Sequence, residues 1–250
     1  MKINGLYKSF GTKIVVNDVS FTIPKGKVTA LIGPNGAGKS TVLNMITRLI
    51  ARDAGRILID DKDLADYQSH DLAKRLAILT QTNHITMKLT VRELVAFGRF
   101  PHAGSRLGQA DWAKVDEAIA YMEMSEFSSR FIDELSGGQR QRAYIAMVLA
   151  QDTEYVFLDE PTNNLDIYHS SNMMKLCRKF SDELGKTVIL VLHEINFAAC
   201  YSDYIGAFKD GALYQFDTVD KVMTAETLKA LYQVDFQIQQ LNGKPVSLYY

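Results

Sequence analysis

The fold is decided by one short stretch of sequence, Gly33-Pro34-Asn35-Gly36-Ala37-Gly38-Lys39-Ser40-Thr41. It fits the pattern GxxxxGK[ST], and it lies between an apolar run at 28–32 and an amphipathic segment at 39–50, as a phosphate-binding loop requires. Glycines let such a loop curl so that its N–H groups point inward, and the following helix adds the positive end of its dipole. We assign the whole stretch to nucleotide binding, with Lys39 on the β- and γ-phosphates and Ser40 on Mg²⁺. The pattern alone leaves kinases, GTPases and ATPases open.

Strands and helices alternate on both sides of this loop. Short apolar runs predict three strands within the first 32 residues, at 15–16, 19–23 and 28–32, and further strands at 55–60, 76–80, 155–158 and 188–192. The segment from about 90 to 150 is predicted to be helical, with a Thr90–Glu93 capping box opening one helix, and another helix is expected near 220–232. This order predicts an α/β fold with a mainly parallel sheet and a helical subdomain.

A pair of carboxylates follows one of the predicted strands. Asp159 and Glu160 come directly after the apolar run Tyr155–Leu158, and ligands of open α/β sheets bind at the carboxyl ends of the strands. Asp159 is therefore expected to hold Mg²⁺, and Glu160 is placed to act as general base on the attacking water.

Composition narrows the class of protein. The chain has 250 residues with 28 Lys and Arg against 29 Asp and Glu, so no basic field points to nucleic acid as a partner. No apolar run approaches the roughly 20 residues that span a bilayer, and the N-terminus lacks the apolar stretch of a signal peptide. We expect a cytosolic chain that reaches a membrane only through a partner, with Cys177 and Cys200 as free thiols.

A third motif makes the assignment specific. The sequence Leu135-Ser136-Gly137-Gly138-Gln139 resembles the signature motif of the ABC ATPase family, and it lies between the phosphate loop and the Asp159–Glu160 pair in the family's order. The resemblance covers essentially the whole chain. It implies a P-loop NTPase cassette with a RecA-like parallel-sheet core and an N-terminal antiparallel β subdomain, both within 1–85 and 152–250, and a helical signature subdomain at 86–151.

The resemblance also assigns roles to residues outside these motifs. Gln81 resembles the Q-loop glutamine that contacts Mg²⁺ and water, and His193 resembles the switch histidine at the γ-phosphate. Phe10 stands where the family stacks an aromatic ring on adenine, and Asn163-Asn164-Leu165-Asp166 resembles the D-loop, which implies that Asp166 contacts nucleotide. Four alternatives stay open: Gln81 and His193 as polar ends of strands, Phe10 as a core residue, and Asp166 as a helix N-cap.

In the family two cassettes sandwich two ATP molecules, so that Ser136, Gly137, Gly138 and Gln139 of one subunit contact the ATP held by the other. The resemblance therefore implies a homodimer that hydrolyses ATP. It also implies partner permease subunits, a periplasmic or lipoprotein substrate-binding protein, and a peripheral position on the cytoplasmic face of the plasma membrane.

Two segments suggest the transported substrate. The run Phe97-Gly98-Arg99-Phe100-Pro101-His102 resembles a segment of ATPases for iron-siderophore, haem and cobalamin uptake, and Cys200-Tyr201-Ser202-Asp203-Tyr204 resembles those for catecholate siderophores. We therefore expect import of a ferric siderophore, with haem or cobalamin import and a non-transport ABC ATPase as alternatives. A permease helix is expected to dock at about 82–105, where Phe97, Phe100 and Pro101 form either its apolar floor or part of the helical packing.

Overall fold

The computed structural model describes residues 1–81, 87–104 and 106–249. Two compact units divide the chain: the first contains Met1–Tyr67 and Cys177–Tyr250, and the second contains Gln68–Leu176. The boundaries predicted at 86 and 151 concern a functional subdomain, and they stay a prediction.

An antiparallel sheet forms the N-terminal part of the first unit. Its strands are β1 (Lys2–Phe10), β2 (Lys13–Thr22), β4 (Ala54–Ile59) and β5 (Lys62–Asp63), in the order β2-β1-β4-β5. The prediction of two strands at 15–16 and 19–23 was wrong, because both runs belong to β2, and β1 was missed. Irregular pairing explains both errors: Gly5 and Asp18 have positive φ, and the register shifts between Ile3 and Leu6. These irregularities interrupt the simple alternation by which strands are recognised.

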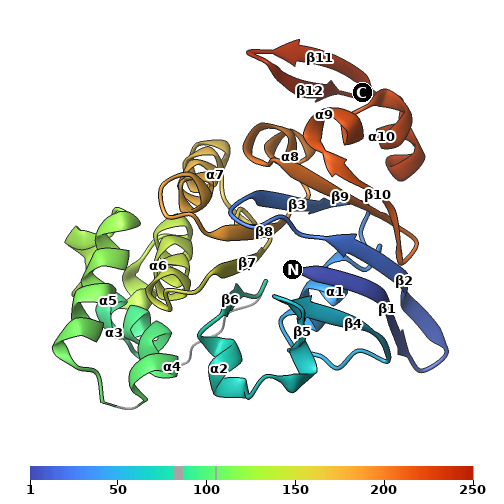
Figure 1. Cartoon of the computed structure of the whole chain (residues 1–250). Coiled ribbons are helices and arrows are strands. Elements are labelled where there is room, and N and C mark those ends of the chain that lie inside the picture. The colour runs from blue at the N-terminus through green and yellow to red at the C-terminus, as the bar shows by residue number, and fades with distance from the viewer. Residues whose placement is uncertain (82–86, 105, 250) are drawn as a thin grey trace. The chain divides into compact units, whose positions relative to one another are not determined.

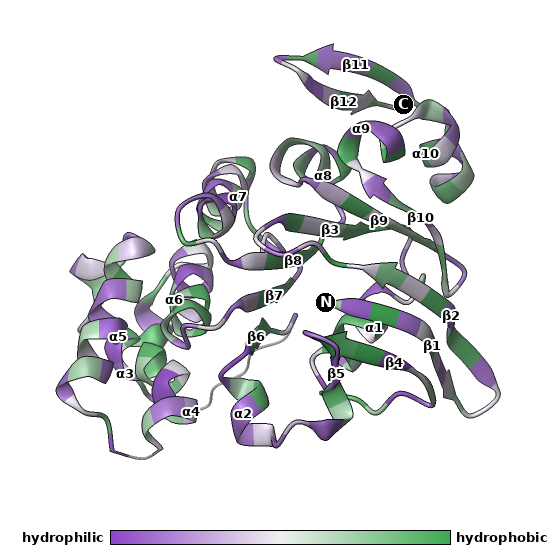
Figure 2. Cartoon of the chain, viewed as in Figure 1, coloured by the Kyte–Doolittle hydropathy of each residue, from purple (hydrophilic) through white to green (hydrophobic). Residues whose placement is uncertain are grey.

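The phosphate loop belongs to a second group of strands in the same unit. Strand β3 (Val28–Ile32) pairs in parallel with β8 (Thr187–Val191) and β9 (Tyr204–Lys209), and β10 (Ala212–Thr218) pairs antiparallel with β9 (Figure 1). Every residue of β3 and β8 is buried, as expected for parallel strands covered on both faces. The contrast between the apolar β9 and the polar β11 of the C-terminal hairpin can be followed in Figure 2.

Helix α1 (Lys39–Ile46) follows the phosphate loop and is shorter than the apolar segment at 39–50 predicted. The helix ends there because Thr47 turns its hydroxyl back onto the Leu43 carbonyl oxygen (2.9 Å) and Arg48 adopts a positive φ of 62°. Leu49 consequently lies 53% exposed instead of continuing the buried face.

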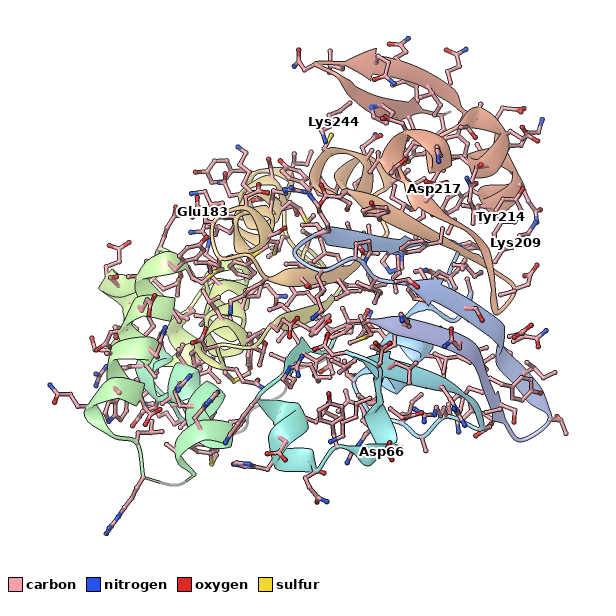
Figure 3. All side chains as sticks on the ribbon, in the orientation of Figure 1. Asp66, Glu183, Lys209, Tyr214, Asp217 and Lys244 are labelled. Atoms are coloured by element: carbon pink, nitrogen blue, oxygen red, sulfur yellow. The ribbon has the colours of Figure 1, made fainter. Side chains whose placement is uncertain are left out.

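The C-terminal part of the first unit packs against its parallel strands. Its elements are α8 (Ile195–Tyr201), α9 (Val219–Val222), α10 (Ala225–Tyr232), β11 (Gln237–Leu241) and β12 (Lys244–Leu248), so the helix predicted near 220–232 is two helices. Lys209, labelled in Figure 3, donates from the end of β9 to the Ala230 carbonyl oxygen of α10 at 2.7 Å. Asn196 of α8 exchanges hydrogen bonds with the backbone of Ser247 in β12 (3.1 and 2.8 Å).

The second unit combines two parallel strands with a group of helices. Strand β6 (Leu76–Leu79) pairs with β7 (Tyr155–Asp159). The α-helices of this unit are α2 (Ser69–Ala73), α3 (Val91–Ala96), α4 (Phe100–Ala103), α5 (Gln109–Tyr121) and α6 (Gly137–Ala150). Its 3₁₀ turns are η2 (Phe97–Arg99), η3 (Ser125–Phe127) and η4 (Ile132–Glu134), while η1 (Leu64–Asp66) belongs to the first unit. Helix α7 (Ile167–Asp182) is divided between the two units. Helices α3, α5 and α6 pack pairwise. The predicted Thr90–Glu93 capping box is confirmed at the start of α3.

Two further expectations concern cysteines and membrane segments. Both cysteines are free, and burial raises the pKa of the Cys177 thiol to about 12, so this thiol stays protonated and unreactive. Within the described ranges, no helix is long and apolar enough to cross a bilayer.

Candidate nucleotide-binding site

The phosphate loop is held by the backbones of two strands that belong to different sheets. At Gly33, where φ is 141°, a β-carbon would overlap the Phe208 carbonyl oxygen of β9. At Gly38, where φ is 94°, a β-carbon would lie 2.7 Å from the Val15 carbonyl oxygen of β2. Only glycine combines these φ values with such close backbone approach. The conformation of the loop is therefore fixed from both sides by the fold.

Lys39 is positioned by the loop that it closes. Its side chain is 5% exposed, and its ammonium group donates to the carbonyl oxygens of Gly33 (2.7 Å) and Pro34 (3.0 Å). A buried ammonium group is costly unless polar groups or an anion surround it. The two carbonyl oxygens fix the charge at the loop, where a phosphate group would neutralise it.

The first turn of α1 offers further donors to an anion. Gly38 is the N-cap of the helix and forms no side-chain cap hydrogen bond. Because the first N–H groups of a helix have no partner within it, an uncapped start is suited to binding phosphate. Ser40 and Thr41 lie in this first turn, Ala37 closes the loop by donating its N–H to the Pro34 carbonyl oxygen (3.2 Å), and Asn35 and Gly36 are exposed at the tip. The loop residues thus have the geometry of a phosphate cradle.

His193 lies at the same edge of the parallel strands as the loop. Leu192 donates its N–H to the Leu31 carbonyl oxygen (3.1 Å), so the chain beyond β8 leaves the sheet beside the end of β3. His193 is exposed, while Glu194 caps α8 by accepting from the Asn196 N–H (3.3 Å). Glu194 is therefore the N-cap of α8, and the alternative of His193 as a polar strand end stays open. The role of His193 at the γ-phosphate stays a prediction.

Phe10 is not a core residue. Its side chain is 53% exposed at the end of β1, and the Lys8 ammonium group lies 5.3 Å from the ring centroid. The alternative of a packed core phenylalanine is therefore wrong. An exposed ring is available to stack on a base, and that role stays a prediction.

Gln81 and Glu160 are joined by a hydrogen bond in the second unit. Leu79 of β6 pairs with Leu158 of β7, so Gln81 and Glu160 stand at equivalent positions beyond the two strands. The Gln81 amide nitrogen donates to Glu160 Oε2 at 2.8 Å. Register along the parallel pair therefore brings together two residues that sequence reasoning assigned separately to catalysis.

The two acids at the end of β7 differ in environment. Asp159 is 4% exposed, whereas Glu160 is half-buried and has a left-handed φ of 53°. A non-glycine residue in this region is uncommon and carries a small conformational cost. The left-handed turn ends the strand and gives the two successive carboxylates different surroundings, as their different predicted roles require.

The predicted D-loop is a turn that leads into α7. Asn163 donates its N–H to the Glu160 carbonyl oxygen (3.0 Å), and Asn164 has a positive φ of 60°. Asp166 Oδ1 accepts from the His169 N–H at 2.7 Å, which is an N-cap contact. The N-cap alternative for Asp166 is therefore confirmed, and its contact with nucleotide stays a prediction.

The signature motif opens α6 with a capping box. Ser136 Oγ accepts from the Gln139 N–H (3.3 Å), and Gln139 Oε1 accepts from the Ser136 N–H (3.0 Å). The two glycines differ: a β-carbon at Gly137 would meet nothing within 4 Å, while one at Gly138 would lie 3.3 Å from the His169 ring. Sequence reasoning missed His169, because this contact joins distant parts of the chain and leaves no local pattern.

The predicted magnesium ligands are divided between the two units. Ser40 belongs to the first unit, and Gln81 and Asp159 belong to the second. Among the described residues, no cluster of three or more His, Cys, Asp or Glu side chains could hold a metal ion. The hydroxyl, amide and carboxylate oxygens fit a hard cation such as Mg²⁺, which is usually bound by few protein groups together with substrate phosphates.

The segment predicted to receive a permease helix is described in part. Residues 82–86 and 105 lie outside the described residues. The Phe97 and Phe100 rings contact each other edge to face at a centroid distance of 4.8 Å, and Phe100 is 45% exposed while Pro101 is half-buried. Phe97 is half-buried and Phe100 is exposed, so both alternatives for these residues stay open.

Comparison with solved structures supports the fold. The structure of a dimeric bacterial ABC transporter cassette aligns with 87% of this chain and with 98% of the cassette's own chain, with a TM-score of 0.77 and 30% identity. An inward-facing putative metal-chelate type ABC transporter matches 100% of this chain and 96% of its own, with a TM-score of 0.86. At 22% identity, the second match bears on the fold alone.

Sequence comparison reaches the same family. The model of a protein family described as "ABC transporter" matches residues 16–163. The chain is 44% identical to the petrobactin import ATP-binding protein YclP of Bacillus subtilis (strain 168), covering 100% of this chain and 99% of that protein. It is 46% identical to the petrobactin import protein FatE of Bacillus anthracis, with 100% of both covered, and 37% identical to the ferric enterobactin transport protein FepC of Escherichia coli (strain K12), covering 89% and 83%. The chain therefore belongs to the ABC transporter family and is one of its ATP-hydrolysing cassettes.

Proposed function

We propose that this cassette powers the import of a ferric siderophore through a partner permease. The observation that carries the proposal is identity of 44% and 46% over the whole chain to two petrobactin import ATPases. An iron(3+)-hydroxamate import ATPase of Bacillus subtilis is 42% identical over 96% of the chain. Within the siderophores we keep the catecholate type as the expected ligand, and the experiment below includes a hydroxamate.

The chemistry follows from the two groups of site residues. Lys39 and the start of α1 bind the β- and γ-phosphates of ATP, and the exposed Phe10 ring stacks on the base. Mg²⁺, held through Ser40, Gln81 and Asp159 when bound, offsets phosphate charge. Glu160 accepts a proton from the attacking water while Gln81 holds its carboxylate in place, and His193 contacts the γ-phosphate.

The working unit in this proposal is a homodimer on the cytoplasmic face of the membrane. Ser136, Gly137, Gly138, Gln139 and Asp166 of one subunit contact the ATP of the other. A permease helix docks on the helical subdomain, proposed as residues 86–151, near the exposed side chain of Phe100. A periplasmic or lipoprotein receptor delivers the ligand to the permease. The dimeric cassette structure at 30% identity supports the pairing of two such chains.

The test is ATPase activity stimulated by a loaded receptor. The cassette is co-expressed with its neighbouring permease genes, reconstituted in vesicles, and supplied with receptor carrying ferric catecholate, ferric hydroxamate, haem or cobalamin. We expect stimulation by the ferric catecholate receptor and by none of the other three.

Each other outcome has a distinct meaning. Stimulation by the hydroxamate alone would keep siderophore import and overturn the catecholate type. Stimulation by haem or cobalamin would overturn the siderophore while leaving the transport mechanism in place. The absence of both a permease complex and stimulation would favour a non-transport ABC ATPase.

A further inference from the structure

We propose that Gln151 is a positioning residue, which fixes the signature helix α6 against strand β6 and thereby helps to orient the Gln81–Glu160 pair. The inference deepens the proposed function in one respect: it rests on ATP hydrolysis at Glu160, and it is independent of what is transported.

Gln151 joins two elements directly. Its amide nitrogen donates to the carbonyl oxygens of Ala73 (2.6 Å) and Leu76 (3.0 Å). Ala73 is the last residue of α2, and Leu76 is the first residue of β6. Carbonyl oxygens at a helix end lack partners within the helix, so the amide satisfies one of them while fixing the start of the strand.

The end of α6 is held from its other side as well. Arg99, which is 8% exposed, donates to the Ala150 carbonyl oxygen (2.8 Å), and His102 Nε2 donates to the Gln151 carbonyl oxygen (2.8 Å). At Gly98 a β-carbon would overlap the Met147 carbonyl oxygen, so this segment lies directly on the last turn of α6. The guanidinium of Arg99 is a cationic donor, and such a group complements the terminal carbonyl groups of a helix.

Arg99 is itself anchored, because its Nε donates to Asp111 Oδ1 of α5 (3.1 Å). The last turn of α6 therefore has fixed contacts to α5, to segment 98–102 and, through Gln151, to β6. The resemblance to importer ATPases at Phe97–His102 thus marks residues that hold the end of the signature helix.

The opposite ends of α6 and β6 carry the site residues of this unit. Helix α6 begins at the Ser136 cap, and β6 leads to Gln81, whose amide nitrogen donates to Glu160. Strand β7, which leads to Glu160, begins shortly after Gln151, and its first residue Tyr155 donates its N–H to the Arg75 carbonyl oxygen (3.0 Å). Gln151 therefore connects the end of the signature helix by hydrogen bonds to β6, the strand that pairs with β7.

Loss of the two hydrogen bonds donated by the Gln151 amide should leave the fold intact and loosen the position of β6 relative to α6. Apolar packing of the buried Ala143, Ala146 and Val148 on α6 remains, so the helix itself persists. The phosphate loop lies in the other compact unit, so ATP affinity should be unchanged. The expected signature is a lower kcat at constant KM, because only the orientation of the base is affected.

The experiment compares three substitutions in the full chain, assayed for basal ATPase without permease or siderophore. Gln151→Ala removes both donors, Gln151→Glu places a carboxylate against two carbonyl oxygens, and Gln151→Arg keeps donors for both. Gln109→Ala, at an exposed glutamine of α5, is the matched control. We expect kcat to fall about fivefold to tenfold in the first two, with arginine and the control within about twofold of the parent.

A double substitution with Gln81→Ala separates positioning from a general loss of stability. If Gln151 acts through the Gln81–Glu160 pair, removing both side chains lowers kcat by less than the product of the single effects. The inference would be overturned if the double substitution lowered kcat by the full product of the single effects. It would also be overturned if Gln151→Ala left kcat unchanged, or if Gln151→Arg failed to restore it. An inactive parent chain would instead point to a failure of the proposed ATPase function.

Discussion

Two helix N-termini in this molecule, both proposed to contact ATP, are capped in opposite ways. Helix α1 starts at Gly38, whose φ is 94° and which provides no side-chain cap. Helix α6 starts at Ser136, which forms a reciprocal capping box with Gln139. Helix α6 thus satisfies part of its own first turn with side chains, whereas Gly38 has no side chain with which to cap α1.

The surroundings of the two glycine loops differ in the same direction. Gly33 and Gly38 are enclosed by the backbones of Phe208 and Val15, while Gly36 at the tip of the loop is open. In the signature motif, a β-carbon added at Gly137 would meet nothing within 4 Å, and one at Gly138 would lie 3.3 Å from the His169 ring. The phosphate loop is therefore fully built within one subunit. The start of α6 has an open side and an exchangeable cap, which suits a contact formed only when a second subunit brings its ATP.

Removing the charge at the built loop should give the largest effect. Lys39→Ala deletes the ammonium group that the Gly33 and Pro34 carbonyl oxygens hold in place. We expect ATP to bind about 100-fold more weakly or worse, because a charge-assisted phosphate contact is lost in a buried position. Isothermal titration calorimetry measures this, with Lys175→Ala at an exposed site of α7 as the control. ATP binding within about threefold of the parent would remove Lys39 from the site.

Substitution of the base should separate binding from chemistry. Glu160→Gln preserves the shape of the side chain that contacts Gln81 and removes its basicity. We expect ATP binding and ATP-dependent dimerisation to persist, while turnover falls by about 10²-fold or more. Steady-state ATPase assays and size-exclusion chromatography with ATP provide the two readouts. Undiminished turnover would show that another group activates the water.

A substitution at the start of α6 should lower ATPase activity without changing nucleotide binding at the phosphate loop. Ser136→Arg replaces the cap with a long cation at the exposed start of α6. Nucleotide binding to a single subunit should stay within about twofold, whereas ATPase activity should fall about tenfold to 100-fold because closure is blocked. A variant that hydrolyses ATP normally would contradict the contact of the signature motif with the second subunit's nucleotide.

Local patterns predicted the features that depend on neighbouring residues. The apolar runs at 28–32, 155–158 and 188–192 marked buried parallel strands, and the Thr90–Glu93 capping box marked the start of α3. The same reasoning missed β1, because the shift at Gly5 interrupts its alternation, and extended α1 beyond Ile46.

Tertiary contacts set the remaining part of the site. The Gln81–Glu160 bond depends on the register of β6 and β7, and the contacts of Gln151 and His169 join distant segments. Motif spacing assigned Gln81 and Glu160 without the bond between them. It gave no reason to single out Gln151, which donates hydrogen bonds to α2 and β6, or His169, whose ring lies beside Gly138.

The smallest predicted effects compare one glycine from each loop. Gly38→Ala places a β-carbon 2.7 Å from the Val15 carbonyl oxygen at a φ of 94°, so the unfolding free energy should fall by about 1–3 kcal/mol. Gly137→Ala meets nothing within 4 Å and lies in the first turn of α6, so stability should be unchanged or rise by up to about 1 kcal/mol. Urea denaturation of both variants measures the difference. Equal losses would mean that the α6 cradle is as tightly built as the phosphate loop, and the distinction between a permanent and a conditional anion site would fail.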